Sequence, residues 1–216
     1  MNASIDIKAL PGRPKDLEKR AAILEAAKSL FLSRGFEGTS MDAVAAEAGV
    51  SKLTVYSHFG DKDTLFSSAV QSKCERQLPE AMFHMPPPGT PIRKALLAIA
   101  QGFHELVHSP ETIALHRMMV ASSGQSTRLA ELFFEAGPKR TLASFERFLR
   151  EAIAAGELEI KEPSRAAGHF LVLLKGLNHM RQLVGCAGAM SEKERDAHIK
   201  SVVDLFLRAY QVDRKL

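Results

Sequence analysis

The chain has 216 residues, of which 45% are hydrophobic and 25% charged, and its formal net charge is +4. This composition is typical of a globular protein that can bury a core, and no apolar run approaches the ~18 residues of a membrane span. Only 6% of the residues are aromatic and none is Trp, which argues against a β-sandwich. The N-terminus lacks the apolar core of a signal peptide, so we expect a cytoplasmic protein.

The overall charge is a poor indicator of a nucleic-acid partner. Residues 1–66 hold nine Lys or Arg and nine Asp or Glu, so the positive surplus lies in the rest of the chain. The two cysteines, Cys74 and Cys186, stand far apart without C-x-x-C spacing. This pattern predicts two buried thiols, with a redox-sensing pair as the alternative.

The first 16 residues show no periodicity and contain the run P-G-R-P-K. Pro11 and Pro14 disfavour helix, so residues 1–16 are expected to form a flexible basic arm. An extended arm carrying Arg13 and Lys15 would suit the minor groove of DNA, and an ordinary solvated tail is the alternative.

A first helix is predicted over residues 17–34, followed by two short helices joined by a tight turn. In residues 39–49 the apolar side chains recur at the spacing of one buried helical face. Thr39 or Ser40 can cap this helix, Asp42 can complete a capping box with Thr39, and Gly49 ends it. Ser51 then caps a helix of about two turns.

The short helix after Ser51 has an unusual outward face. Val55 and Phe59 face inward at a spacing of four, which leaves the other side chains outside, and none of them is acidic. A cation, hydroxyl groups and an apolar side chain without acid suit phosphates and base edges in a major groove. Two helices with a glycine-containing turn make a helix-turn-helix.

The run V-S-K-L-T-V-Y-S-H-F-G-D-K-D-T-L-F resembles the signature of the TetR/AcrR family of bacterial transcriptional repressors. The family pattern of Tyr, His-Phe, Lys and Leu falls on Tyr56, His58, Phe59, Lys62 and Leu65. The specific resemblance covers about residues 17–70. It implies base contacts from Lys52, Leu53, Thr54 and Ser57, and phosphate contacts from Thr39, Ser40, Ser51, Tyr56 and Lys62. His58 fits a phosphate contact and an inward position equally well.

The rest of the chain reads as helices separated by Pro, Gly and Ser. A connector helix is expected over residues 61–83, and the triple proline 86–88 marks the clearest boundary. Further helices are expected to begin near Pro91, Pro110, Ser126, Pro138, Pro163 and Ser191. We predict an all-α protein with a helix-turn-helix DNA-binding domain at 17–66 and a larger effector-binding and dimerisation domain at 84–216.

The family resemblance implies an effector pocket and a dimer interface in the C-terminal domain. The pocket candidates are Phe103, His104, Met118, Met119, Phe134, Phe145, Phe148 and Asn178, many of which also suit a plain core. The last two long helices would pair with those of a second subunit through Phe170, Leu171, Leu174, Leu177, Val202, Leu205 and Phe206. Burial of the helix expected from Pro163 within one subunit is the alternative, because that helix is apolar nearly all round.

One segment suggests another class of function. His104-Glu105-Leu106-Val107-His108 matches H-E-x-x-H, the helical signature of zinc proteases. No third ligand follows in the extended pattern, so a metal sensor or metal-dependent enzyme is only the alternative hypothesis. We predict a protein without enzymatic activity or cofactor that acts as a homodimeric, ligand-responsive repressor on a palindromic double-stranded operator.

Overall fold

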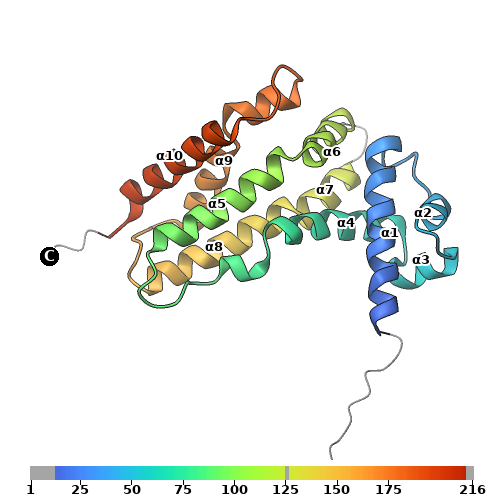
Figure 1. Ribbon diagram of the computed structural model, residues 1–216, viewed down its shortest axis with the longest axis horizontal. Helices are drawn as coiled ribbons and strands as arrows, with labels where there is room; N and C mark the ends of the chain where they lie inside the picture. The colour runs from blue at the N-terminus through green and yellow to red at the C-terminus, as the bar shows by residue number, and fades with distance from the viewer. Residues whose placement is uncertain (1–12, 125–126, 213–216) are drawn as a thin grey trace, which may run out of the picture. The chain divides into compact units, whose positions relative to one another are not determined.

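The computed structural model describes residues 13–124 and 127–212, and its described residues are almost entirely helical, as predicted (Figure 1). None of these helices is both long and apolar enough to cross a membrane. The α-helices are α1 (Arg13–Arg34), α2 (Met41–Glu47), α3 (Lys52–Phe59), α4 (Lys62–Gln77), α5 (Ile92–His108), α6 (Pro110–Ala121), α7 (Thr127–Ala136), α8 (Pro138–Ala154), α9 (Pro163–Leu183) and α10 (Glu192–Tyr210). A 3-10 helix, η1, spans Glu80–Phe83.

The chain divides into two compact units, residues 1–69 and 70–216. The division falls inside α4, so this helix contributes side chains to both units. Leu65 and Phe66 of α4 are buried in the first unit, whereas its later residues belong to the second.

The first unit is closed by an apolar core at the centre of α1, α2, α3 and the start of α4. Phe31, Phe36 and Phe66 form a ring cluster with centroid separations of 5.3–5.7 Å. Val44 of α2 and Val55 of α3 are fully buried. Helices as short as α2 and α3 are marginally stable on their own. Their stability therefore comes from packing against this shared core rather than from helix propensity.

Local capping explains where α2 and α3 begin and end. The Ser40 side chain accepts a hydrogen bond from the Ala43 N–H, and the Ser51 side chain accepts one from the Thr54 N–H. Ser40 is therefore the cap of α2, and no capping box between Thr39 and Asp42 forms. Gly49 adopts φ = 66° in the turn, a left-handed conformation that glycine reaches without steric cost.

Two expected boundaries differ in the structure. Helix α1 begins at Arg13, so residues 13–16 are helical rather than part of an extended arm; the rest of the expected arm lies outside the described residues. Pro14 fits there because the first turn of a helix needs no N–H from it. The connector α4 ends at Gln77 instead of reaching residue 83, because Pro79 disfavours helix at Leu78.

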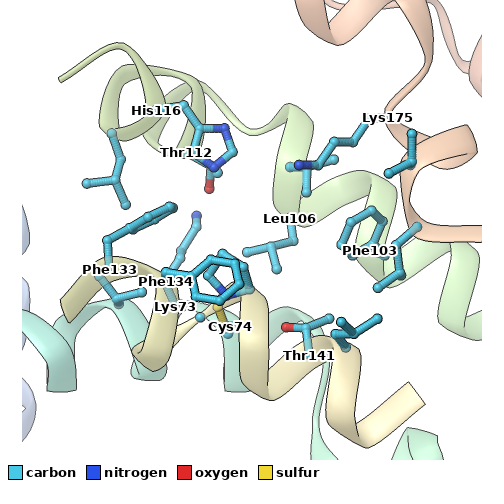
Figure 2. A pocket seen from close by; sticks show the side chains of 18 of the residues that line it. Lys73, Cys74, Phe103, Leu106, Thr112, His116, Phe133, Phe134, Thr141 and Lys175 are labelled. Carbon is cyan, nitrogen blue, oxygen red and sulfur yellow. The ribbon is translucent and has the colours of Figure 1, made fainter. Parts of the chain in front are cut away.

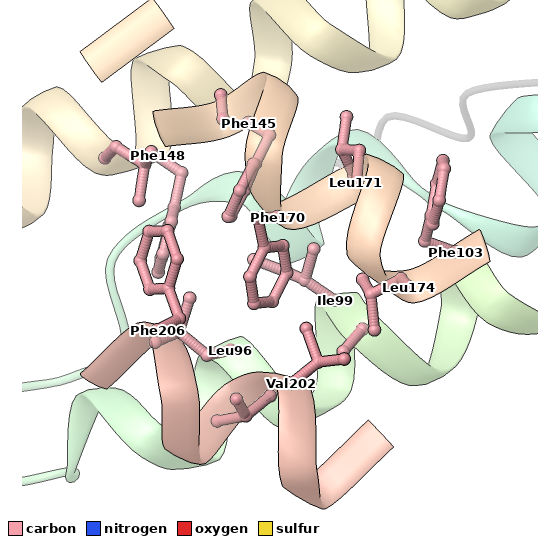
Figure 3. Packing of buried hydrophobic residues seen from close by; sticks show 14 of the residues in the cluster. Leu96, Ile99, Phe103, Phe145, Phe148, Phe170, Leu171, Leu174, Val202 and Phe206 are labelled. Carbon is pink, nitrogen blue, oxygen red and sulfur yellow. The ribbon is translucent and has the colours of Figure 1, made fainter. Parts of the chain in front are cut away.

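The second unit has its core between α5, α8, α9 and α10. Figure 3 shows Phe170 of α9 lying between Phe145 of α8 and Phe206 of α10. The ring centroids of Phe145 and Phe170 are 4.8 Å apart, and those of Phe170 and Phe206 are 4.9 Å apart. Helix α7 packs against α8, and α6 packs against α5 and α9.

Helix α9 is interrupted at Gly176, whose φ of 59° and ψ of −179° are not helical. Histidine side chains satisfy the two carbonyl groups before the break. His108 Nε2 donates to the Lys175 carbonyl and His198 Nε2 donates to the Leu174 carbonyl, each at 3.1 Å. The break therefore lies between α5 and α10 and is held by both of them.

Candidate DNA-binding surface and ligand cavity

Helix α3 presents an exposed face without any acidic side chain of its own. Leu53 is 79% exposed and Tyr56 is 41% exposed, while Lys52 and Ser57 are also exposed. The predicted base-contacting residues Lys52, Leu53 and Ser57 thus share an accessible helix, with Thr54 half-buried beside them. Hydroxyl, ammonium and aliphatic groups on one short helix are the chemistry that a major groove can accept.

Neighbouring residues hold this face in place. Lys52 Nζ lies 2.8 Å from Asp42 Oδ1 of α2, and the hydrogen bond to Asp42 raises the pKa of Lys52. The Ser51 and Thr54 side-chain oxygens are 2.8 Å apart, and Ser57 Oγ donates to the Thr54 carbonyl. DNA would therefore compete with Asp42 for Lys52, so this lysine is pre-positioned rather than free.

Three predicted phosphate ligands have partners within the unit. Thr39 is 2% exposed and its Oγ1 donates to the Gly35 carbonyl at 2.8 Å. Lys62 Nζ donates to the Phe36 carbonyl at 3.0 Å and lies 4.3 Å from the Phe36 ring centroid. His58 is half-buried, with Nε2 3.3 Å from an Asp16 carboxylate oxygen. These contacts give each of the three a structural role whether or not DNA is bound.

Ser40 is the cap of α2 and is exposed to solvent. Lys15 is exposed in the first turn of α1, in a helix and not in an extended arm. The backbone of Arg13 lies in the same turn of α1.

The second unit contains a cavity of about 210 Å³ whose lining is mostly apolar (Figure 2). Phe103 and Leu106 of α5, Phe133 and Phe134 of α7, and Leu171 of α9 supply much of its wall. The polar side chains of the lining come from α4, α6, α8 and α9: Lys73, Cys74, Thr112, His116, Thr141 and Lys175. Such a site, with apolar walls and few polar groups, is suited to a small organic molecule.

Burial sets the protonation of several polar groups in and beside the cavity. It raises the pKa of the Cys74 thiol to about 11, so this thiol stays protonated at neutral pH. Burial, aided by the charges of His179 and Lys175, lowers the pKa of His116 to about 4. His116 Nδ1 lies 3.2 Å from His179 Nε2, and one of the two neutral rings donates to the other. Cys186, in contrast to the expected burial, is exposed.

The structure brings two of the eight predicted pocket residues, Phe103 and Phe134, to this cavity. Phe145 and Phe148 are fully buried in the core of the unit, where apolar spacing alone cannot distinguish them from cavity walls. Met118 and Met119 are half-buried on α6 and do not line the cavity.

The other two predicted pocket residues are polar and do not line the cavity. His104 is 4% exposed and stacks on His108 at a ring separation of 4.0 Å, and its Nε2 has no hydrogen-bond partner in the described part of the chain. The same holds for the amide nitrogen of the half-buried Asn178.

Sequence reasoning did not select the two lysines of the cavity. Lys175 could have been found, because it is the sole polar side chain in the otherwise apolar run from Phe170 to Leu177. Lys73 carries no such signal, since it stands in the ordinary polar sequence of α4.

After the break at Gly176, helix α9 carries an exposed apolar stripe on the second unit. Leu177 and Met180 of this part, together with Val184 directly after the helix, follow one another at spacings of three and four and are 56–77% exposed. Of the seven predicted interface residues, Leu177 and Leu205 are exposed, at 77% and 48%. The other five are buried within the subunit and offer no surface to a partner: Phe170, Leu171, Leu174, Val202 and Phe206.

Comparison with known proteins decides the family. Residues 23–69 match the family model of bacterial regulatory proteins of the tetR family, and residues 94–212 match that of the AefR-like transcriptional repressor, C-terminal domain. The chain belongs to the TetR family. Together the two matches cover the helix-turn-helix and most of the unit that contains the cavity and the apolar stripe.

Individual TetR-family proteins resemble the chain over most of its length. The regulator SrpR of Pseudomonas putida is 27% identical over 161 residues, which are 74% of this chain and 73% of SrpR. The crystal structure of a regulator from Mesorhizobium loti is 28% identical, with a TM-score of 0.76, and covers 92% of this chain and 99% of its own. The flavonoid-responsive regulator FrrA is 34% identical, with a TM-score of 0.68, and covers 90% of this chain and 98% of its own.

The H-E-x-x-H segment has no catalytic role in this TetR-family protein, since the family consists of transcription regulators and not of enzymes. His104 and His108 lie with their rings stacked, and Glu105 is exposed. Within residues 13–124 and 127–212, no three His, Cys, Asp or Glu side chains are grouped so that they could hold a metal ion. The match to the protease signature is therefore one of spacing alone.

Proposed function

We propose that this TetR-family regulator is a homodimeric repressor that binds a palindromic double-stranded operator and releases it when a small amphiphilic or hydrophobic molecule enters the cavity. The proposal depends above all on the exposed, acid-free face of α3 formed by Lys52, Leu53 and Ser57. DNA carries dense negative charge, and α3 adds no carboxylate to this face; the neighbouring Asp42 carboxylate is paired with Lys52. Such a regulator works in the cytoplasm, with the DNA.

A second copy of the chain is the partner that the apolar stripe of α9 favours. Leu177 is 77% exposed and Met180 is 56% exposed, and apolar side chains aligned along one helix gain free energy when they are removed from water. A two-fold dimer would present two α3 helices, which accounts for a palindromic operator with half-sites about one DNA turn, roughly 34 Å, apart.

The cavity supports the ligand response. Its apolar walls and few polar groups suit a small effector, and the relative FrrA is described as flavonoid-responsive. Helix α4 is common to both units, with Phe66 in the core of one and Lys73 at the cavity of the other. Suppose that the effector prefers a dimer whose two α3 helices are spaced too widely or too closely for the operator. The effector would then lower operator affinity by the ratio of its affinities for the two dimer states, and by no more.

Selection of binding sites from a random pool of duplexes by the purified protein tests the DNA-binding part. We expect enriched sequences with two-fold symmetry and an affinity that falls steeply with salt, as for a dimer that neutralises on the order of 6–10 phosphates. Lys52→Ala is expected to lower the ratio of operator to random-DNA affinity about 10-fold, because base contacts carry the discrimination.

Lys200→Ala, which removes an exposed lysine of α10, is the matched control and should leave that ratio unchanged. Competition binding at two salt concentrations separates the ratio from the overall affinity. A Lys52→Ala protein with an intact preference would show that α3 is not the reading face, and an unenriched pool would remove the repressor proposal altogether.

A further inference from the structure

The described lining of the cavity contains lysines but no carboxylate. Among the described residues that line it, two are lysines, one is a histidine, and none is Asp or Glu. In Figure 2, Lys73 and Lys175 extend from α4 and α9 toward the space that His116 and Thr112 also face. A site built this way has positive potential inside an apolar wall, where electrostatic interactions are stronger than in water.

The two lysines differ in whether their charge is balanced. Lys73 Nζ lies 3.3 Å from a carboxylate oxygen of Glu111, so its charge is paired within the unit. Burial lowers the pKa of Lys175, and no carboxylate in the described part of the chain forms an ion pair with it. Lys175 is thus a cavity lysine whose counter-ion the surrounding structure does not supply.

The groups nearest to Lys175 cannot take that role. His108 donates to the Lys175 carbonyl, and this contact involves the backbone rather than the ammonium group. Burial, aided by the charge of Lys175, lowers the pKa of His116 and of His179 to about 4, so both rings are neutral at pH 7 and carry no negative charge. A half-buried ammonium group without an opposite charge costs free energy, and a ligand that pairs with it recovers that cost.

We propose that the cavity binds a small, largely apolar organic acid whose carboxylate pairs with Lys175. The inference rests on the ligand response proposed above and names the chemical class of that ligand. The apolar part of the acid would occupy the wall formed by Phe103, Phe133, Phe134 and Leu171. A neutral ligand would leave Lys175 unpaired, and a cationic one would add repulsion from Lys175.

Matched probes test this ligand class directly on the full chain. Naphthalene-2-carboxylate, naphthalene-2-carboxamide and 2-naphthylmethylamine share one ring system and carry a negative, no and a positive charge; octanoate and octanamide repeat the comparison on an alkyl chain. Binding is measured by isothermal titration calorimetry. We expect each acid to bind about 10- to 100-fold more tightly than its amide, the range for one hydrogen-bonded charge, and the amine to bind least.

Variants at position 175 assign the preference to that residue. Lys175→Met keeps the length of the side chain and removes the charge, so acid and amide should then bind within about 2-fold of each other. Lys175→Arg should retain the preference, and Lys161→Met, at an exposed lysine that does not line the cavity, should match the unaltered protein. Thermal unfolding of each variant verifies that the unit is folded.

The outcomes separate the ligand class from the ligand response. Equal binding of acid and amide, a preference that survives Lys175→Met in a folded protein, or no binding of any acid at about 1 mM would each overturn the organic-acid proposal. Operator binding is measured separately with and without the acid. An acid whose binding requires Lys175 but which leaves operator affinity unchanged would refute the proposed ligand response. It would still support the organic acid as the class of ligand.

Discussion

Gly176 occupies a backbone conformation that other residues rarely adopt. Its φ of 59° with ψ of −179° lies in a region that is essentially restricted to glycine. A Cβ added to it would lie 3.0 Å from His198 Cε1, closer than an ordinary contact. The break in α9 therefore depends on the absence of a side chain at this position as well as on the histidines around it.

Replacing this glycine should destabilise the second unit. We expect Gly176→Ala to lower the free energy of unfolding by about 1–3 kcal/mol, the usual cost of such a backbone conformation. Gly168→Ala on the same helix is the control: Gly168 has helical geometry and open space around it, so alanine there should be neutral or slightly stabilising. Urea unfolding of both variants measures the difference, and equal stabilities would mean that the break is not strained.

Individual residues show where sequence reasoning succeeds and where it stops. Ser51 as the cap of α3 follows from local chemistry, and so does the inward position of Val55 and Phe59. Phe145 and Phe148 illustrate the limit: apolar spacing shows that they are buried but not whether they face a cavity or a filled core. Thr39 was expected to face DNA, yet it is buried because Ser40, and not Thr39, caps α2.

Five histidines connect α5, α6, α9 and α10 around the break. His104 and His108 stack at 4.0 Å, His108 lies 5.6 Å from His179, and His116 lies 5.3 Å from His179, all as ring separations. His198 completes the group 6.0 Å from His104. Burial, together with nearby positive charge, lowers the pKa values of His104, His116 and His179 to about 4. These three histidines therefore stay largely unprotonated where an unfolded chain would take up protons.

Mild acid should destabilise this cluster. Between pH 6.5, where unfolded histidine titrates, and about pH 4, the unfolded chain binds more protons than the folded one, so stability falls as the pH falls. Each responding histidine contributes a slope of at most about 1.4 kcal/mol per pH unit. Urea unfolding at several values from pH 7 to pH 5 measures the slope while most carboxylates remain ionised.

His116→Gln should make that slope shallower, because it removes one buried histidine that resists protonation. His169→Gln, at an exposed histidine of α9, is the control and should give the slope of the unaltered protein. A free energy of unfolding that stays constant from pH 7 to pH 5 would contradict the protonation argument.

At the level of elements, sequence signals predicted helix starts better than helix faces. Ser109 before Pro110 caps α6, and the capping box of Ser191 and Glu194 is present at α10. Helix α9 was harder, because a sequence that is apolar nearly all round does not show which side meets the core. The break at Gly176 was also not predicted, since its supports come from α5 and α10, distant in the sequence.

At the scale of the whole molecule, the proposed function joins DNA reading to ligand binding through a dimer. One α3 helix buries few contacts on DNA, so useful operator affinity requires two reading helices on one rigid pair of subunits. The apolar stripe of α9 suits this pairing, since Leu177, Met180 and Val184 recur at helical spacing after the break and face solvent. Operator DNA and effector must then weaken each other's binding by the same factor.

Placing charge on the stripe should separate the subunits without unfolding them. Leu177→Glu combined with Met180→Glu changes two exposed side chains, so we expect the free energy of unfolding of the subunit to change by no more than about 0.5 kcal/mol per site. Paired with a second copy, the four introduced carboxylates would be buried together without counter-ions, which strongly opposes association. Analytical ultracentrifugation should show a dimer for the unaltered protein and a monomer for the double variant.

Operator titration then tests what the dimer contributes. A monomer engages one half-site at a time, so operator affinity should fall by about 10²- to 10⁴-fold while affinity for random DNA changes far less. Val120→Glu, at an apolar side chain of α6 that is 65% exposed, should leave both the mass and the operator affinity unchanged. If the double variant sediments as a dimer, the subunits pair through another surface. If it is a monomer that binds the operator with full affinity, the two half-sites are not read together. An effector could then not act by changing the spacing between two α3 helices.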